Sequence, residues 1–473
     1  MVPLIIPIGA LLAGVALLLL GTGLLNTILA LRSSIEGYSS TTLGLIMSSY
    51  FAGFFVGTYL ALPIISRMGH IRAFAFCAAI AAATVLAHEI FVNPIAWMVL
   101  RVFTGISLVI LYTVIESWLN GQTPSEQRGK VFAIYMTVNL GALAVAQQLL
   151  RIDPSITFLL FAISSILICL SLTPITWTRM KQPEVTDISR IKLSQVFKAA
   201  PVAVLSSAFS GLAMGAFWGL AAAYASKIGF QSSSVATFVT CAIVGGAVFQ
   251  FPLGKFSDGQ DRRKVIFIIS AAAAVVALLL SVISSLPYAM FVVIAVYGGL
   301  AFAIYPVAVA HLVDHLDAKD MLGGSSQLLL INGIGSMMGP ALAGQLMEIF
   351  GVNSLPIFWS VALAILALSS YWFIARSKQE NPEDHNADFV PMLRTSPMAF
   401  EMLPPEQNED GEIIEDSTSV WGGNDISHNP TETDENLDID QTELREPNNS
   451  ELNTDFESDE LDTRNNQKHI SDH

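Results

Sequence analysis

The chain has 473 residues, of which 53% are hydrophobic and 13% are charged. A soluble protein of this length carries about twice that charged fraction, so the composition excludes a soluble globular domain. The charge is also uneven, because residues 1–378 hold 20 Lys and Arg against 13 Asp and Glu, whereas residues 379–473 hold 4 against 26.

Twelve apolar segments follow one another along the chain, at residues 4–31, 43–66, 71–91, 94–119, 131–150, 155–178, 199–225, 234–256, 265–286, 287–313, 322–349 and 354–376. Each is long enough to cross ~30 Å of hydrocarbon as a helix, and the first is too long for a cleaved signal peptide. Strands of a membrane barrel would instead alternate over about ten residues. We therefore expect an all-α membrane protein with twelve transmembrane helices.

The Lys and Arg residues predict how these helices are oriented. With a cytoplasmic N-terminus, sixteen basic residues fall in inside loops and flanks, and three fall outside: Arg32, Arg151 and Lys227. An excess of basic residues marks cytoplasmic loops. The pattern predicts a multi-pass protein with both termini in the cytoplasm.

The body divides into two halves of six helices. The longest internal polar stretch, 179–198, is predicted as a cytoplasmic loop between one half at 1–178 and another at 199–376. The halves echo each other, since SRMGHIR (66–72) follows the second segment and SDGQDRRK (257–264) follows the eighth. Paired six-helix halves are typical of transporters with a substrate site between the halves.

The remaining residues, 377–473, are rich in Asp, Glu, Asn, Ser and Thr and predict a disordered acidic cytoplasmic tail. One stretch, DFVPMLRTSPMAFEMLPP (388–405), holds a cluster of apolar residues. It either docks on the body, binds a cytoplasmic partner or stays undocked. The tail's composition favours the undocked interpretation.

The fourth segment carries a polar stripe. At about 100° per residue, Arg101, Gly105, Tyr112 and Glu116 fall within roughly 60° of one another on one helix face. Ionisable residues at membrane depth are costly and indicate function. We expect Arg101 to bind a substrate anion or relay protons and Glu116 to act as a gate or a protonatable carboxylate. The alternative makes Glu116 a helix-end anchor paired with Arg128 or Lys130.

The stretch GKFSDGQDRRK (254–264) packs six charges between two apolar segments. It is similar to the loop signature of the major facilitator superfamily, in which a glycine and an aspartate precede a basic cluster. The matching residues are Gly254, Asp258, Arg262, Arg263 and Lys264, with Gly259 and Asp261 departing from the pattern. A degraded copy in the first half retains Arg67, Gly69 and Arg72, and Arg101 and Gly105 match a second signature. The alternative is a solvated, positively charged loop.

Several strings are closer to the YcaD-like bacterial branch of this superfamily: LLNTILALRSSIEGYSS (24–40), GHIRAF (69–74), YTVIESWLN (112–120) and AHLVDHL (310–316). The resemblance covers about residues 1–376. It implies the superfamily fold, a place in the bacterial plasma (inner) membrane, and transport by alternating access as a symporter or antiporter.

In that superfamily the first, fourth, seventh and tenth spans line the cavity. The resemblance and the stripe together make the cavity candidates Asn26, Arg101, Tyr112, Glu116, Trp218, Tyr305 and Asn332. The inner-gate candidates are His311, Asp314 and Asp320. Interhelical hydrogen bonding is the structural alternative for each polar cavity candidate, and a loop-side ion pair for the gate residues. By resemblance, Asp258 faces the start of span five near residues 128–130, and Asp320 lies opposite Arg67.

The glycines of GIGSMMGPALAG (333–344) predict close helix approach at Gly335 and Gly339. No Walker lysine loop or nucleophile triad occurs, so we expect no enzyme, cofactor, metal site or nucleic-acid partner. We expect a monomer that moves a small organic solute, driven by protons. The alternative is a transporter-like receptor or scaffold that signals through its acidic tail.

Overall fold

A computed structural model describes residues 2–124, 127–177, 183, 191–284, 286–376, 389–393 and 395–402. All elements of regular secondary structure among these residues are helices. The long helices are α1 (Val2–Ile35), α2 (Ser40–Met68), α3 (His70–Ile90), α4 (Pro94–Gln122), α5 (Arg128–Gln148), α9 (Pro201–Lys227), α10 (Ser232–Asp258), α11 (Arg262–Val282), α12 (Pro287–Val313), α13 (Ala318–Phe350) and α14 (Ser354–Arg376). The shorter ones are η2 (Leu149–Arg151), α6 (Phe158–Leu170), α7 (Leu172–Trp177), α8 (Leu193–Ala199) and η4 (Pro397–Met402).

Eleven stretches of the described chain are helical, long and apolar enough to cross a membrane. Nine match predicted spans as single helices, the predicted fifth span runs through α5 and η2, and the predicted sixth span is divided between α6 and α7. The predicted eleventh span is the 33-residue helix α13, which is not among the eleven. The predicted loop 179–198 overlaps the short helix α8, and residues 178–182 and 184–190 lie outside the described residues.

Short polar residues set the helix boundaries. Asn93 precedes Pro94 and accepts hydrogen bonds from the amides of Ile95 and Ala96, at 2.9 and 3.4 Å, so it caps α4. Such caps satisfy amides that have no partner within the helix. Gly69 separates α2 from α3 with a φ of 77°, in the left-handed region that favours glycine.

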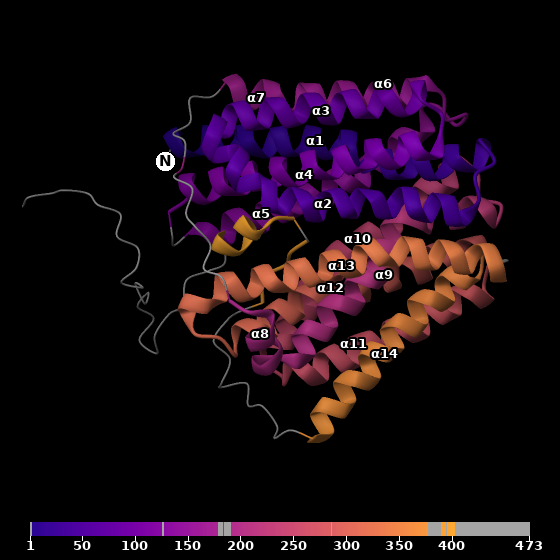
Figure 1. The fold of residues 1–473 in the computed structure, drawn as a ribbon. Coiled ribbons are helices and arrows are strands. Elements are labelled where there is room, and N and C mark those ends of the chain that lie inside the picture. The colour runs from indigo at the N-terminus through magenta and orange to yellow at the C-terminus, as the bar shows by residue number, and fades with distance from the viewer. Residues whose placement is uncertain are drawn as a thin grey trace, which may run out of the picture. The chain divides into compact units, whose positions relative to one another are not determined.

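The helices form two groups that follow the predicted halves (Figure 1). In the first group α4 packs on α2 and α3, and α1 packs on α5 and α6. In the second group α10 packs on α12, α11 on α14, and α9 on α13. The groups meet where α2 contacts α13 and α5 contacts α10. The glycines Gly335 and Gly339 lie against backbone of α9, which confirms the predicted close approach.

The bundle has two chemically different ends. We call the end that carries Arg67 and Arg262 the basic end, and the end at which α1 and α9 finish the opposite end. At the opposite end the amide of Ser40 donates to Glu348 Oε2 at 2.8 Å, and Lys227 Nζ donates to Ser40 Oγ at 2.5 Å. These bonds join the two groups of helices there.

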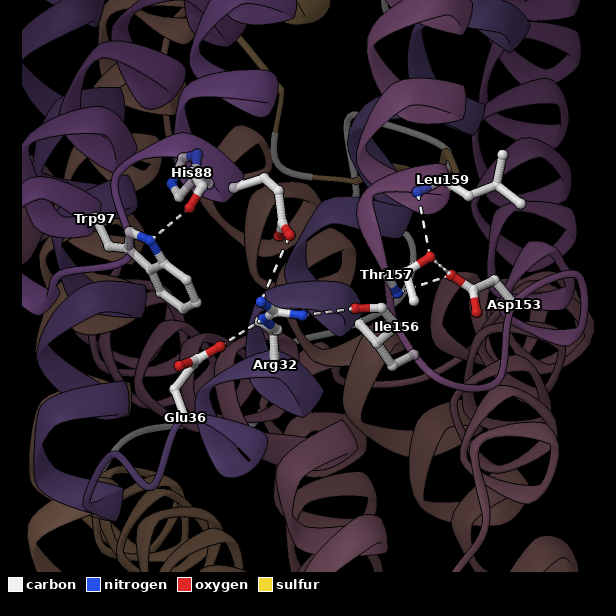
Figure 2. A network of polar contacts seen from close by, with 9 residues as sticks. Arg32, Glu36, His88, Trp97, Asp153, Ile156, Thr157 and Leu159 are labelled. Carbon is white, nitrogen blue, oxygen red and sulfur yellow. Dashed lines mark hydrogen bonds and ion pairs between the residues drawn. The ribbon is translucent and has the colours of Figure 1, made fainter.

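Figure 2 shows a second polar network, which holds the first group together at the opposite end. Arg32 pairs with Glu36 at 2.8 Å and with Glu89 at 3.5 Å, so it ties the ends of α1 and α3. It also donates to the Ile156 carbonyl at 3.2 Å. In the neighbouring turn, burial tends to raise the pKa of Asp153. Hydrogen bonds from Thr157 and Ser155 outweigh this effect, so the pKa lies below its usual value.

Candidate functional site

A cavity of about 150 Å³ lies between the two groups of helices. The predicted candidates that line it are Asn26, Tyr112, Trp218, Tyr305 and Asn332. Its other lining residues are Leu19, Thr22, Gly23, Tyr50, Phe51, Phe54, Leu108, Leu143, Met214, Ala301, Phe302, Ser336, Met392, Leu393 and Thr395. A cavity of this size accommodates a ring the size of benzene. Both groups of helices therefore contribute to one central site.

Aromatic side chains make up much of the cavity wall. Trp218 packs edge-on to Phe302 with ring centroids 5.7 Å apart, and Phe54 lies 6.4 Å from Tyr112. Phe54 was not predicted from the sequence, because it is one apolar residue among many in an apolar helix. Such a wall presents apolar faces together with a few hydroxyl, indole and amide groups, as small-molecule sites do.

Arg101 lies behind the cavity wall and is itself buried. Its NH2 donates to Asn26 Oδ1 at 2.7 Å, and its guanidinium carbon sits 4.4 Å from the ring centroid of Tyr50. Both of these partners line the cavity. The predicted polar stripe therefore faces the protein interior, and Arg101 contacts two residues of the cavity wall.

Glu116 lies closer to the basic end of α4 and is fully buried. Its Oε1 accepts a hydrogen bond from the Tyr135 hydroxyl at 2.8 Å, and its Oε2 accepts one from the Ser396 hydroxyl. The alternative pairing with Arg128 or Lys130 is wrong for this conformation. Within the described residues, Glu116 forms no ion pair and is held by hydroxyl donors from α5 and the tail.

Asn332 is a cavity candidate that also forms hydrogen bonds between helices. Its Nδ2 donates to the Ser207 carbonyl at 3.1 Å and to Ser210 Oγ at 3.2 Å. These bonds cross from α13 to α9, so the amide joins two helices as well as lining the cavity. The structure is therefore consistent with both predicted roles of Asn332, as a cavity residue and as a hydrogen-bonding link between helices.

The charged stretch 254–264, which we call the gate motif, contains a buried charge cluster. Asp261, Arg262 and Arg263 are buried, Asp258 and Lys264 are half-buried, and Lys255 is exposed. Arg262 NH1 and NH2 lie 3.0 Å from Asp314 Oδ2 and Asp258 Oδ1. Asp261, which departs from the family pattern, accepts from the Arg263 amide and side chain at 3.1 Å and caps α11. The structure thereby joins the predicted motif to the predicted inner gate at Asp314.

The first-half copy of the motif is more exposed. Arg67 and Arg72 are exposed, and Lys264 in the second-half copy is half-buried. Arg67 and Asp320 form no ion pair in this conformation, so the predicted pairing across this end is not made here. At this end the η4 turn of the tail contacts α4 and α5 of the first group and α13 of the second, so the tail fills part of the space between the two groups.

The other inner-gate candidate, His311, is buried near the end of α12. Its ring packs on that of His315 at 4.6 Å, and its carbonyl accepts from His315 Nδ1 at 2.8 Å. The predicted gate residues thus lie at one end of the bundle but have different partners. Asp314 pairs with Arg262, whereas His311 contacts His315.

Residues 389–393 and 395–402 of the predicted disordered tail dock on the helices. The amide of Phe389 donates to Asp258 Oδ1 at 2.9 Å, and Leu393 N donates to Met136 Sδ at 3.4 Å. The undocked interpretation is therefore wrong for 389–393 and 395–402, whereas residues 377–388, 394 and 403–473 lie outside the described residues. The predicted contact of Asp258 with the start of α5 stays a prediction, since the hydrogen bonds seen here go to Arg262 and Phe389.

The sequence profile described as Major Facilitator Superfamily matches residues 11–204 and again residues 203–404. The chain belongs to the major facilitator superfamily. It is therefore a multi-pass membrane protein of a transporter family, with the fold expected from the resemblance.

The chain is similar to the proteins called uncharacterized MFS-type transporter YcaD. It is 28% identical to the one from Escherichia fergusonii over 360 residues, which cover 74% of this chain and 91% of the relative. The same identity holds for Escherichia coli O139:H28 over 359 residues. These relatives support the YcaD-like branch.

Two solved structures share the fold. The nucleoside transporter NupG aligns with a TM-score of 0.66 and 12% identity, over 79% of this chain and all of that one. A bacterial homologue of the human lysosomal transporter Spinster, in an inward-facing and occupied conformation, aligns with a TM-score of 0.64 and 17% identity. That alignment covers 80% of this chain and 97% of the homologue.

Proposed function

We propose that this protein is a secondary transporter that moves a small organic solute by alternating access, with the central cavity as its binding site. The observation that carries the proposal is one cavity walled by both groups of helices. Substrate sites of such transporters lie at the interface of their repeats. Rocking of the groups about this cavity would expose it to each side in turn.

The cavity wall indicates the kind of solute. Aromatic faces from Tyr50, Phe54, Trp218 and Phe302 favour a planar or apolar part, and Asn26 and Tyr305 offer polar contacts. The guanidinium of Arg101 behind Asn26 favours a partial or full negative charge. We therefore propose a small amphipathic or anionic solute with a ring or apolar face.

Glu116 is our candidate for proton coupling. Its carboxyl group is buried and bonded to the hydroxyls of Tyr135 and Ser396, which suit a group that exchanges a proton without a bound metal ion. In this proposal, solute binding and proton binding share the same route between the halves. The solute's direction relative to the proton distinguishes a symporter from an antiporter.

The polar bonds at the opposite end fit one state of the cycle. Ser40, Glu348 and Lys227 join the groups there, while the tail segment lies between them at the basic end. The positive-inside pattern makes the basic end cytoplasmic, so the structure corresponds to a cytoplasm-facing state in this proposal. Opening the other side requires these bonds to break.

The test begins with a thermal-shift screen of the purified full-length protein against small organic acids, amides and nucleosides, because bound ligand raises apparent stability. Compounds that raise the melting temperature are then offered to proteoliposomes with an imposed pH gradient. We expect solute accumulation that responds to the gradient and is lost in Glu116→Gln. Solute movement that ignores the gradient would overturn the coupling, and no movement of any stabilising compound would favour a receptor.

A further inference from the structure

The docked tail segment, residues 389–393 and 395–402, lies in a groove built from both groups of helices. Its η4 turn contacts α4 and α5 of the first group and α13 of the second. The Phe389 ring sits directly against Gly254 of α10, where an added Cβ would collide with it. The absence of a side chain at position 254 therefore makes room for the Phe389 ring.

Apolar anchors hold the segment in place. Buried residues of the segment include Val390, Met392, Met398, Ala399, Phe400 and Met402, and Met402 has no exposed surface. Burial of apolar side chains drives such docking, and it also orders the chain between the anchors. A chance contact of a polar tail would not bury this many apolar side chains together.

Two polar contacts fix the register of the segment. At one end, the Phe389 amide donates to Asp258 of the gate motif. Further along, the Ser396 hydroxyl donates to the buried carboxylate of Glu116. Both Ser396 and Glu116 are almost inaccessible to solvent, so neither group finds water as a substitute partner.

The segment also forms part of the cavity wall. Met392, Leu393 and Thr395 line the same cavity as Asn26 and Trp218. Because one segment touches both groups at the basic end, it also occupies space that those ends would fill on approaching each other. Solute entering from this end and the docked segment therefore compete for one volume.

We propose that the groove at the basic end is a peptide-binding site for residues 389–402 of the same chain, and that this segment is a tethered plug. When docked, it blocks solute access from the basic end, holds that end apart and occupies Glu116. When released, it frees the cavity and lets the basic ends approach. The blocking role rests on the proposed transport function, whereas the binding site itself does not.

The binding site is tested by the reactivity of a cysteine introduced at position 395 of the full-length protein. Thr395→Cys is combined with Cys169→Ser and labelled with a charged maleimide in detergent, where both ends are reachable. Thr395 is buried, so labelling requires local opening. Ser194 on α8 is exposed and provides the reference position. We expect labelling of Thr395→Cys to be about ten times slower than that of Ser194→Cys in the same background.

A variant that introduces a negative charge is then expected to release the segment. Ser396→Asp places a second carboxylate against Glu116, and like charges at that distance repel strongly in a buried site. We expect labelling of Thr395→Cys to accelerate by about tenfold, with Ser194→Asp as the matched control that leaves it unchanged. Phe389→Glu, which removes the ring from Gly254 and adds charge beside Asp258, should release the segment independently.

The outcomes separate the two proposals. The peptide-binding site is overturned if Thr395→Cys alone is labelled as fast as Ser194→Cys. It is also overturned if neither Ser396→Asp nor Phe389→Glu changes the labelling rate of Thr395→Cys. If labelling responds as expected, the same variants should transport solute faster at low solute concentration. If the variants accelerate labelling but leave the transport rate unchanged, the plug is overturned. If the variants accelerate labelling but the protein moves no solute, the transport function is contradicted and the peptide-binding site is still supported.

Discussion

Arg262 NH1 at the start of α11 lies 3.0 Å from Oδ2 of Asp314, the residue that follows α12. The side chain of Arg262 has no exposed surface and that of Asp314 is 2% exposed, so this ion pair is almost completely withdrawn from water. It joins two features that the sequence presented separately, the loop motif and the end of the tenth span. The charged loop thereby anchors three helices at the basic end.

Asp314→Asn should lower the stability of the second group of helices. Removing one partner of a buried pair costs about 3–5 kcal/mol, and because Arg262 retains Asp258 we expect a loss at or below the lower end of that range. The measurement is the free energy of unfolding in detergent. The control is Asp320→Asn, at a half-buried carboxylate on α13 that forms no ion pair among the described residues. Equal stability of the two variants would contradict the role of the pair.

Gly105→Ala should destabilise the packing of α4 on α2. An added Cβ would lie 2.7 Å from the Phe54 amide nitrogen and would also meet the Tyr50 carbonyl, so only backbone movement makes room. Overpacking of this kind costs about 1–3 kcal/mol. Thermal unfolding in detergent measures the loss.

Gly141→Ala is the matched control for this packing prediction. Gly141 also lies within a long helix, but an added Cβ there has no other atom within 4 Å. Alanine favours a helix over glycine by about 1 kcal/mol, so this variant should be equal to or more stable than the parent. A loss of stability as large as that of Gly105→Ala would show that close approach is not the cause.

Arg101 and Asn26 should act as one unit in solute binding. The 2.7 Å bond between them directs the guanidinium toward the cavity wall. We expect Arg101→Ala and Asn26→Ala each to weaken solute affinity by about tenfold, and the double variant to be little worse than either, because contacting residues are not additive. Arg376→Ala, at an exposed arginine stacked on Trp372, is the control. Additive losses would argue against a shared role.

Glu348→Ala should shift the transporter toward a state open at the opposite end. The variant removes the acceptor of the Ser40 amide, and a hydrogen bond to a charged group contributes about 1.5–3 kcal/mol before solvent exposure reduces it. The measurement is maleimide labelling of Thr22→Cys, applied to that side of proteoliposomes, which should become about fivefold faster.

The control for this shift is Gln345→Ala, an exposed position on the same helix. It removes a polar side chain of similar size from α13 but leaves the Ser40–Glu348 bond intact. Labelling as fast in this variant as in Glu348→Ala would show that the bond does not hold the opposite end closed.

The helical architecture was predictable because it depends on local properties of the chain. Backbone groups in hydrocarbon must bond within their own segment, so a long apolar run predicts a helix wherever it occurs. The polar stripe on the fourth span was predictable for a related reason, since Arg101 and Glu116 cannot face lipid. The break between α6 and α7 and the helix α8 were missed, because neither carries a strong local signal in the sequence.

The partners of the polar residues were not predictable in the same way. The sequence suggested Arg128 or Lys130 for Glu116 and the start of the fifth span for Asp258. The structure brings both carboxylates to the docked tail segment, at Ser396 and Phe389, and the contact of Asp258 with the fifth span stays a prediction. Closeness in the sequence did not predict the partners of Glu116, because a segment far along the chain reaches the same carboxylate.

The sequence by itself determined that this is a helical membrane protein with two related halves, a basic end and a polar face on its fourth span. Length, apolarity and helical period suffice for these features, because each concerns residues close together in the chain. Only the tertiary structure decided which carboxylate meets which donor and which aromatic rings share the cavity. It also decided that part of the acidic tail docks at Glu116, 280 residues earlier. Such contacts depend on complementary shape and burial between distant segments, which no local pattern encodes.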